Sequence, residues 1–540
     1  MKMSKRIAAM VLCLVLIISA FAGCGASGEQ PDAASSSPAS TAASSSADKP
    51  SENAEQLELS VALWDLQDGF NKEGAANDTI FNDLCKKLNI TIKPIQMSWN
   101  DWNDKLQIWA SSNQMPDITS GLLTSSLYNT LSKQGVLKAI PDDLNKYPNL
   151  QYELSLDSLQ AKKVEGKFYM IPRGDMLNKD APNMSRPIIY RKDWAEQAGF
   201  TEAPGTFDEY VAMVKAVQKQ HPDAAGLSVN TKWYLGTVFL WSFPEASVDS
   251  AWVQENGSWI PVYASEKMYD GIKQLRQLYT DGILDKDFVI QKDADGVVKF
   301  QNGKSFSMFC GTNFQPTKFI EANPDATIEK SVGYMVPFVA PDGNRYTPNG
   351  LPYWSETYLS NKIDDKKLDR ALQLLDYVSG EEYTVLKSNG IENVDWKMEN
   401  GNAISLMSGD QTIQTKYPIT DKFGWLGSWG VVTAASDKKV YSANAPTAQF
   451  DKLFNADYYN ALKEHARPVP VNFDVWQLST PAKDKADTLR NEAMDNLVKV
   501  IVGKDDPVKM WKEAIKGFDS KGLPEAIKET NAKAAEMGIK

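Results

Sequence analysis

The chain has 540 residues, too many for one ordinary domain, and this length suggests roughly two to four compact units. Hydrophobic residues make up 42% and charged residues 24%, which excludes a wholly disordered, collagenous or multi-spanning membrane protein. The formal net charge is -11 and no basic block is present, so we expect no nucleic-acid partner, because phosphate binding needs clustered cations.

The N-terminus has the pattern of a secretory signal. A basic start is followed by an apolar run over residues 7–22, which is shorter than the about 20 apolar residues that a membrane span needs. The run ends in small residues before Cys24, an order that resembles the bacterial lipobox, although Phe21 stands where leucine is usual. We expect residues 1–23 to be a signal peptide and the Cys24 thiol to carry diacylglycerol. An uncleaved signal anchor is the alternative.

Residues 24–56 are expected to be a lipidated tether. They are crowded with Ser and Ala, and such a composition cannot bury enough apolar surface to offset the entropy of ordering the chain. As a flexible coil, the tether would span roughly 30 Å end to end. An anchor followed by a tether predicts a location on the outer face of the cell membrane, in a Gram-positive bacterium, with the lipid as the only membrane contact.

Strand and helix patterns alternate beyond the tether. Expected strands cover residues 57–64, 90–95, a segment opening at Pro116, 187–190, 304–309 and 332–336. Expected helices cover residues 79–88, 99–110, 193–198, 206–218, 268–279, 368–378, 486–501 and 507–518. This order favours parallel strand–helix–strand units, and hence an α/β sheet covered on both faces. Ligands of such sheets bind beyond the carboxyl ends of the strands.

The sequence offers no pattern for a metal, a cofactor or a catalytic nucleophile. Cys85 and Cys310 lie in apolar surroundings and are expected to be buried free thiols. The stretch 293–296 echoes an EF-hand turn, but the first carboxylate and the bidentate glutamate are missing, so a solvated turn is expected. His221 and His465 lie in polar surroundings and are expected at the surface.

Seven stretches, in order, resemble the extracellular solute-binding proteins of family 1, the maltose-binding-protein class, and in particular the large lipoprotein branch that serves carbohydrate ABC transporters. They cover residues 110–118, 135–144, 166–172, 189–194, 278–285, 302–308 and 390–396. Each stretch is a weak match alone, and the shared order over about residues 57–520 is what makes the resemblance specific.

The resemblance implies an α/β fold of two lobes, the type II periplasmic-binding-protein fold, with a ligand cleft between lobes joined by hinge crossings. Lobe one is expected to comprise residues 57–175 plus 331–388, and lobe two residues 176–330 plus 389–540. The Pro172–Gly174 turn and the segment before Val332 are the expected hinges. Large members of the family carry a calcium loop at the place where this chain has the abbreviated stretch 221–226, so no calcium is expected there.

The function implied by the resemblance is that of a monomeric binding protein without a cofactor. It would capture an oligosaccharide or another small solute and deliver it to the permease subunits of an ABC importer. An anchored extracellular glycoside-degrading enzyme is the alternative from another class, and a glycosidase needs two carboxylates across a cleft. A peptide or sensory receptor on the same fold is a third possibility.

Tryptophans are the strongest candidates for ligand contacts, because the C–H faces of sugar rings stack on aromatic rings. Candidates in loop-like settings flanked by Gly or Pro, or at strand ends, are Trp64, Trp354, Trp425, Trp429 and Trp476. Packing in the core or between lobes is the alternative for each. Trp102 and Trp109 share a helical stripe and are expected in the core.

Polar candidates are expected at the ends of strands, where they could hydrogen-bond to sugar hydroxyls. They are Asp65, Asp117, Arg173, Asp175 and Asn313. Surface salt bridges and turn caps use the same residue types and are the alternative for each.

Overall fold

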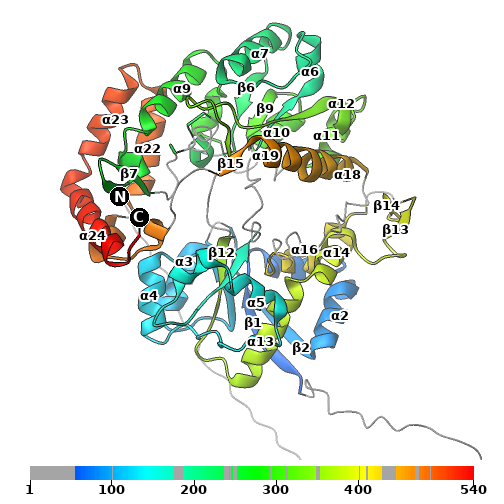
Figure 1. The fold of residues 1–540 in the computed structure, drawn as a ribbon. Coiled ribbons are helices and arrows are strands. Elements are labelled where there is room, and N and C mark those ends of the chain that lie inside the picture. The colour runs from blue at the N-terminus through cyan, green and yellow to red at the C-terminus, as the bar shows by residue number, and fades with distance from the viewer. Residues whose placement is uncertain are drawn as a thin grey trace, which may run out of the picture. The chain divides into compact units, whose positions relative to one another are not determined.

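A computed structural model describes residues 55–99, 101–174, 187–230, 232–235, 242–243, 245–246, 252–291, 295–309, 314–347, 353–400, 402–408, 411–428, 445–468, 474–486 and 488–539 (Figure 1). The predicted signal peptide, Cys24, most of the tether and Cys310 lie outside the described residues. Within the described residues, no helix combines the length and the apolar composition that crossing a membrane requires.

The first sheet has the strand order β2-β1-β3-β12-β4. Its strands are β1 (Leu57–Ala62), β2 (Ile90–Ile95), β3 (Ile118–Gly121), β4 (Ile171–Gly174) and β12 (Tyr353–Leu359). Strand β1 is parallel to β2 and β3, as the alternating pattern predicted. Strand β12 runs antiparallel to β3 and β4, which the sequence pattern did not predict. The α/β class is confirmed, with a mixed rather than a parallel sheet.

The direction of β12 matters for the site. Because β12 is antiparallel, its first residues lie at the edge where the parallel strands end, and Tyr353 is paired with Gly174 and Glu356 with Gly121. The segment around Trp354, expected to be a loop, is therefore the start of a strand. This edge is the one at which α/β sheets bind ligands.

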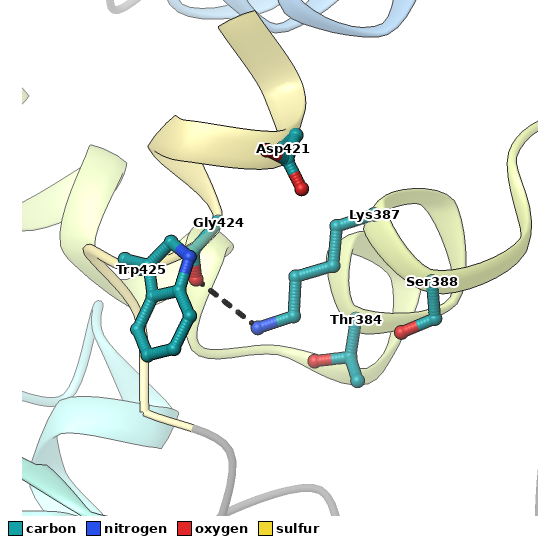
Figure 2. Close-up of a pocket in the computed structure, with 6 residues that line it drawn as sticks. All are labelled: Thr384, Lys387, Ser388, Asp421, Gly424 and Trp425. Carbon is teal, nitrogen blue, oxygen red and sulfur yellow. Dashed lines mark hydrogen bonds between the residues drawn. The ribbon is translucent and has the colours of Figure 1, made fainter. Parts of the chain in front are cut away.

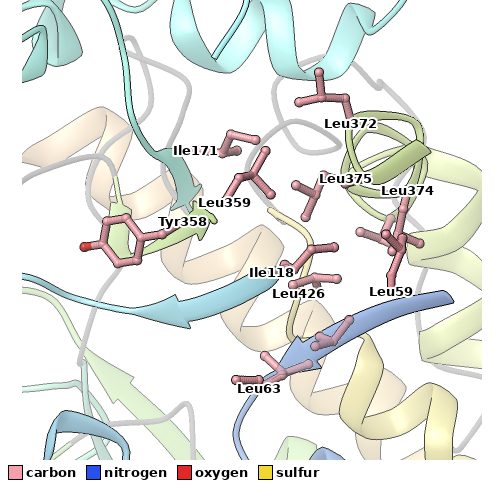
Figure 3. Close-up of a cluster of buried hydrophobic side chains, with 14 of the residues drawn as sticks. Leu59, Leu63, Ile118, Ile171, Tyr358, Leu359, Leu372, Leu374, Leu375 and Leu426 are labelled. Atoms are coloured by element: carbon pink, nitrogen blue, oxygen red, sulfur yellow. The ribbon is translucent and has the colours of Figure 1, made fainter. Parts of the chain in front are cut away.

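Helices cover the first sheet and share its core. They are α1 (Leu66–Asn71), α2 (Thr79–Leu88), α3 (Trp102–Ser111), α4 (Ser125–Lys133), α5 (Pro148–Leu154), α13 (Asp365–Val378), α14 (Glu381–Asn389), α15 (Ile413–Lys416) and α16 (Pro418–Phe423). Figure 3 shows Leu374 of α13 beside Leu59 of β1, and Leu375 of the same helix on the side of Ile118 and Leu359. Leu426 joins the same core from the far end of the chain.

The second sheet has the order β10-β5-β9-β6. Its strands are β5 (Ile188–Arg191), β6 (Ala225–Ser228), β9 (Ser305–Phe309) and β10 (Val332–Met335). The helices that follow the strands of this half are α6 (Lys192–Gln197), α7 (Phe207–Gln220), α9 (Met268–Thr280), α10 (Asp295–Gln301), α11 (Pro316–Ala322) and α12 (Ile328–Ser331). The predicted capping box of Thr206 and Glu209 is present at the start of α7.

The C-terminal part is helical and packs on the core of the second sheet. It contains α18 (Ala445–Asp451), α19 (Tyr459–His465), α20 (Asp474–Gln477), α21 (Pro481–Ala486), α22 (Leu489–Val502), α23 (Pro507–Lys516) and α24 (Leu523–Glu536). Short strand pairs are β7 (Trp252–Glu255) with β8 (Ser258–Pro261), β11 (Tyr346–Thr347) with β15 (Arg467–Pro468), and β13 (Trp396–Glu399) with β14 (Asn402–Ser405). Buried residues of α22, including Leu497 and Ile501, belong to the same core as Ile188 of β5.

The expected lobe boundaries need three corrections. Val332–Met335 was assigned to lobe one but pairs with β5 in the second sheet. Residues Tyr417–Leu426 were assigned to lobe two but contribute to the core of the first sheet. The Pro172–Gly174 segment, expected to be a hinge turn, belongs to strand β4 and is buried. The chain therefore crosses between the two cores after β4, again before β12, and a third time after Leu426.

Burial of Glu153 gives the stability of the fold a pH dependence. This side chain of α5 is fully buried, and burial raises the pKa of Glu153 to about 8 from an ordinary value of 4.5. The folded protein therefore holds the proton more tightly than the unfolded chain. The stabilisation is complete below about pH 4.5 and is lost as the pH rises through about 8.

We predict that Glu153→Gln, a neutral side chain of the same size, flattens this pH dependence. The variant should be more stable than the parent protein at pH 9 by up to roughly 4 kcal/mol, because it removes a carboxylate that would have to ionise in the core. Urea unfolding at pH 5, 7 and 9 measures the difference, with Glu73→Gln as an exposed control. Parallel pH profiles for the parent protein and Glu153→Gln would contradict the assignment.

Candidate functional site

Aromatic side chains gather where the strands of the first sheet end. Trp64 follows β1, Trp99 follows β2, Arg173 lies near the end of β4, and Trp354 lies at the start of β12. The end of every parallel strand and the start of the antiparallel strand share one edge, so the topology brings these four residues together. Together with Trp102 and Trp425, the tryptophans form what we call the tryptophan cluster (Trp64, Trp99, Trp102, Trp354 and Trp425).

In the tryptophan cluster, the buried ring of Trp64 packs against the partly exposed rings of Trp99 and Trp354. Trp64 is 2% exposed, and its ring stacks on Trp99 with centroids 4.7 Å apart and planes 10° apart. Trp354 tilts against Trp64 at 5.4 Å and lies nearly parallel to Trp99 at 6.0 Å. Trp99 is 45% exposed and Trp354 38% exposed. Two large apolar rings are thus held side by side while open to solvent.

The Trp425 ring lies nearly perpendicular to the two exposed rings, Trp99 and Trp354. Its plane is 81° from that of Trp99 and 88° from that of Trp354, with centroids at 5.9 and 6.2 Å. Trp102 of α3 meets the edge of Trp64 at 6.0 Å. Flat rings with one upright neighbour form a surface on which a sugar ring can stack through its C–H face.

Asp78 holds the segment that carries Trp425. This buried residue caps α2 by accepting a hydrogen bond from the Phe81 N–H at 3.1 Å. Its second oxygen accepts from the backbone N–H groups of Ile419 and Thr420, at 2.9 and 2.7 Å, at the start of α16. The Thr420 hydroxyl also donates to Asp78 at 2.6 Å. One carboxylate therefore joins two helices that are far apart in sequence and sets the position of the turn after α16.

Arg173 is a buried cation beneath the tryptophan cluster. It is 2% exposed, and its guanidinium carbon lies 4.9 Å from the centroid of Trp64 and 4.7 Å from that of Trp354. Nη1 donates to the Ser355 hydroxyl at 2.9 Å. Burial lowers the pKa of Arg173 to about 9, so the side chain stays charged at neutral pH. A desolvated cation–π contact stabilises the protein by about 2 kcal/mol, whereas burying an ion costs several kcal/mol.

Two buried donors of this region have no acceptor among the described residues. They are the Nε of Arg173 and the indole Nε1 of Trp64. Because a buried donor without an acceptor carries its full desolvation cost, about 1–3 kcal/mol, such groups mark places where a ligand or water binds.

A pocket of about 310 Å³ adjoins Trp425. It is lined by Thr384, Lys387, Ser388, Asp421, Gly424 and Trp425 (Figure 2). The half-buried Lys387 reaches from α14 toward the Trp425 ring and donates to the Gly424 carbonyl at 3.1 Å. Burial and the charge of Arg173 lower the pKa of Lys387 to about 7. Trp425 is common to the pocket and the tryptophan cluster, so we treat both as one candidate ligand-binding site.

A buried ion pair fixes the start of β12. Glu356 of β12 and Lys162 are both buried, and their Nζ–Oε1 distance is 2.8 Å. The hydroxyls of Tyr353 and Tyr358 donate to the same carboxylate. Because Trp354 and Ser355 lie between these residues, the network holds the Trp354 backbone and the Arg173 partner in place.

The structure places some predicted residues in the site and one elsewhere. Trp64, Arg173, Trp354 and Trp425 come together there, while Asp117 does not. Asp117 lies at the amino end of β3 and accepts from the Ser60 N–H and hydroxyl at 2.8 Å. These contacts place Asp117 at the end of β3 that is away from the cluster, where it fixes the sheet, and its contact with ligand stays a prediction.

Asp65 lies next to the tryptophan cluster in an unusual backbone conformation. Its φ of 54° is in the left-handed region, where it precedes α1. Burial, followed by the nearby charge of Asp68, raises the pKa of Asp65. A carboxyl group there can serve a sugar hydroxyl, so Asp65 stays a prediction.

Several candidates cannot be placed. Asp175, Asn313 and Trp429 lie outside the described residues, and for Trp476 only the backbone is described, in α20. Among the described residues, no group of three or more His, Cys, Asp or Glu side chains is arranged to hold a metal ion. Cys85 is free and partly buried, and burial raises the pKa of its thiol to about 12, which makes it unreactive.

Sequence reasoning missed Trp99 and Lys387, whereas Trp102 packs against the core of the first sheet as expected. Trp99 was included in the helix that follows it, but the Ser98 N–H donates to Asp101 at 2.7 Å and α3 begins at Trp102. Trp99 therefore lies in the turn after β2, in the same relation to its strand as Trp64. That relation was a signal that could have identified it. Lys387 carried no signal, because a lysine in the last turn of a helix is common there, where it complements the helix dipole.

Comparison with known proteins identifies relatives. The family model described as "Bacterial extracellular solute-binding protein" matches residues 79–391. The lipoprotein LipO of Bacillus subtilis is 22% identical over 459 residues, covering 78% of this chain and 84% of LipO. The polygalacturonan/rhamnogalacturonan-binding protein YtcQ of the same organism is 23% identical over 309 residues, covering 54% of this chain and 58% of YtcQ.

Solved structures share the fold. The substrate-binding protein FusA of Streptococcus pneumoniae, in complex with kestose, aligns with a TM-score of 0.63 at 16% identity, over 90% of this chain and 99% of FusA. A solute-binding protein of Bifidobacterium longum infantis, described as binding HMO, aligns with a TM-score of 0.62 at 16% identity, over 88% and 98% of the two chains. The predicted two-lobed α/β binding-protein fold is confirmed.

Proposed function

Because the chain belongs to the bacterial extracellular solute-binding proteins, we propose that it captures an oligosaccharide outside the cell and delivers it to the permease of an ABC importer. The tryptophan cluster carries this proposal. Two half-exposed rings, Trp99 and Trp354, lie side by side with Trp425 upright beside them. Sugar rings present flat C–H faces that such rings bind, and the buried polar groups around Arg173 can hydrogen-bond to the sugar.

The relatives support a carbohydrate as the solute. YtcQ is named for binding polygalacturonan and rhamnogalacturonan, and FusA is described in complex with kestose. The proteins compared are binding proteins rather than enzymes, and we propose that this chain likewise leaves its ligand intact. The polar chemistry of the site fits binding, since the basic side chains Arg173 and Lys387 lie beside the aromatic rings and can hydrogen-bond to an intact sugar.

A binding screen tests the proposal. The mature protein, without its predicted signal peptide, is titrated calorimetrically with oligosaccharides of four to six sugars from pectin, alginate, fructan, chitin and mannan. We expect micromolar or tighter binding to at least one class, with the bound oligosaccharide recovered uncleaved. Turnover that disappears when one carboxylate is mutated would favour the glycoside-degrading alternative, and binding of peptides but of no sugar would favour the receptor alternative.

We also propose that the protein is attached to the outer face of the membrane through Cys24. LipO is named as a lipoprotein, and Cys24 follows an apolar run and small residues. We predict that Cys24→Ala prevents lipid attachment and processing, so the protein is released into the medium or kept as the longer precursor. Metabolic labelling with a fatty-acid analogue and cell fractionation measure this, with Cys85→Ala as control. Unchanged labelling of Cys24→Ala would refute the anchor.

A further inference from the structure

Burial of the charged Arg173 side chain carries a large desolvation cost. The side chain is almost completely buried beneath Trp64 and Trp354, and its one hydrogen bond to a described residue goes to the uncharged hydroxyl of Ser355. None of the described carboxylates forms an ion pair with it. A buried cation is normally paired with an anion, because the protein interior screens its charge poorly.

The donors that lack acceptors lie together. Arg173 Nε and Trp64 Nε1 are both buried without an acceptor among the described residues, and the guanidinium lies 4.9 Å from the Trp64 ring. Their neighbour Trp354 covers the guanidinium at 4.7 Å, and its ring is partly exposed on strand β12. Rotation of the Trp354 side chain would open the guanidinium to a ligand group.

A second basic side chain lies close by. Lys387 lines the pocket beside Trp425, and the charge of Arg173 acts on its ammonium group. The acid that shares this pocket, Asp421, forms an ion pair with Lys422 at 3.2 Å. Asp65, at the other side of the tryptophan cluster, lies near Lys422 and Asp68 rather than Arg173. Arg173 is thus a cation beside the exposed tryptophans that none of the described carboxylates pairs with, although the chain as a whole is acidic.

From this arrangement we infer that the ligand is an acidic oligosaccharide, and that Arg173, assisted by Lys387, binds a uronic-acid carboxylate beside the tryptophan cluster. This inference rests on the proposed function and adds the charge of the ligand to it. A carboxylate is favoured over other acceptors because the planar guanidinium matches its two oxygens, and because it supplies both an acceptor and the missing charge. The aromatic rings then hold the C–H faces of the neighbouring sugars.

The experiment compares each acidic probe with a neutral counterpart of the same length. Oligouronates of four to six sugars from polygalacturonan and from alginate are used, and each is also chemically reduced so that every carboxylate becomes a primary alcohol. We expect at least one oligouronate to bind at least about tenfold more tightly than its reduced form, since charged hydrogen bonds are worth about twice as much as neutral ones. Its affinity should also fall with added salt more steeply than that of the reduced form.

Variants assign the charge recognition to residues. Arg173→Met and Lys387→Met should each weaken binding of the oligouronate by about tenfold or more and change binding of the reduced form by less than about threefold. Lys422→Met removes the same charge from a lysine already paired with Asp421 and serves as the matched control, with a smaller effect expected on the oligouronate. If Arg173→Met does not fold, as judged by its thermal unfolding, Lys387→Met alone decides the result.

The possible outcomes separate the inference from the proposed function. Binding of neutral oligosaccharides with no preference for oligouronates would overturn the acidic-ligand inference and leave the proposed function standing. Equal losses for both ligand forms in Lys387→Met would also overturn it, because the residue would then act without regard to charge. If no oligosaccharide of either kind binds, the proposed function itself fails.

Discussion

Trp99→Ala and Trp354→Ala are each expected to weaken oligosaccharide binding by about 10- to 70-fold. A sugar ring stacked on one indole face buries about 60–100 Å² of apolar surface, worth about 1.5–2.5 kcal/mol. Both rings are partly open to solvent, so their loss removes little packing from the core. The melting temperature without ligand should change by only a few degrees. Calorimetric titration with the tightest-binding oligosaccharide of the screen, beside thermal unfolding, measures both effects.

Trp511→Ala is the matched control for these two variants. Trp511 is fully buried on α23, and its indole donates to the Tyr263 carbonyl at 3.1 Å. Its removal should cost about 3–5 kcal/mol of stability and leave the affinity unchanged at a temperature where the variant is folded. If Trp99→Ala and Trp354→Ala instead lose stability and keep their affinity, the tryptophan cluster is a packing feature and the site lies elsewhere.

Asp78→Ala is expected to lower the free energy of unfolding by about 3–5 kcal/mol. The substitution removes the cap of α2 and leaves the buried N–H groups of Ile419 and Thr420 without an acceptor, each costing about 1–3 kcal/mol. Because these bonds hold the start of α16, the turn that carries Trp425 should also lose its fixed position. Affinity for the oligosaccharide should then fall together with stability.

Urea unfolding and calorimetric titration test this coupling. Asp364→Ala is the control, since Asp364 caps α13 through a single bond to the Lys367 N–H at 2.9 Å and is exposed. That variant should lose only about 1 kcal/mol and keep its affinity. A loss for Asp78→Ala no greater than that for Asp364→Ala would show that the contacts between Asp78 and α16 contribute little.

Much of the fold could be predicted from local patterns. Helix α2 matches its predicted bounds, and β1, β2 and β3 are parallel as the alternation of strands and helices indicated. Strand β12 was not predicted, because its residues follow a stretch rich in Gly and Pro that is typical of a loop. The hydrogen bond from the Thr420 N–H to Asp78 joins residues 342 positions apart, and a local sequence pattern cannot predict such a contact.

Site residues could be predicted where a residue type suited to binding a sugar stands near the end of a strand. Trp64 and Arg173 were identified because each stands near the end of an expected strand. The same rule failed for Asp117, which precedes its strand and therefore lies at the other end. Lys387 could not be found in this way, since its place beside Trp425 depends on how α14 packs against the turn after α16.

The spacing of the tryptophan cluster has an optical consequence. Indole rings whose centroids lie 4.7–6.0 Å apart, such as Trp64, Trp99 and Trp354, are close enough for their electronic transitions to couple. The coupling depends on the angle between the rings, so a small rotation of Trp354 alters the near-ultraviolet circular dichroism of the whole group. A ligand that moves one ring therefore changes a spectrum to which the other rings contribute. Near-ultraviolet circular dichroism is therefore expected to report ligand binding to the unlabelled protein.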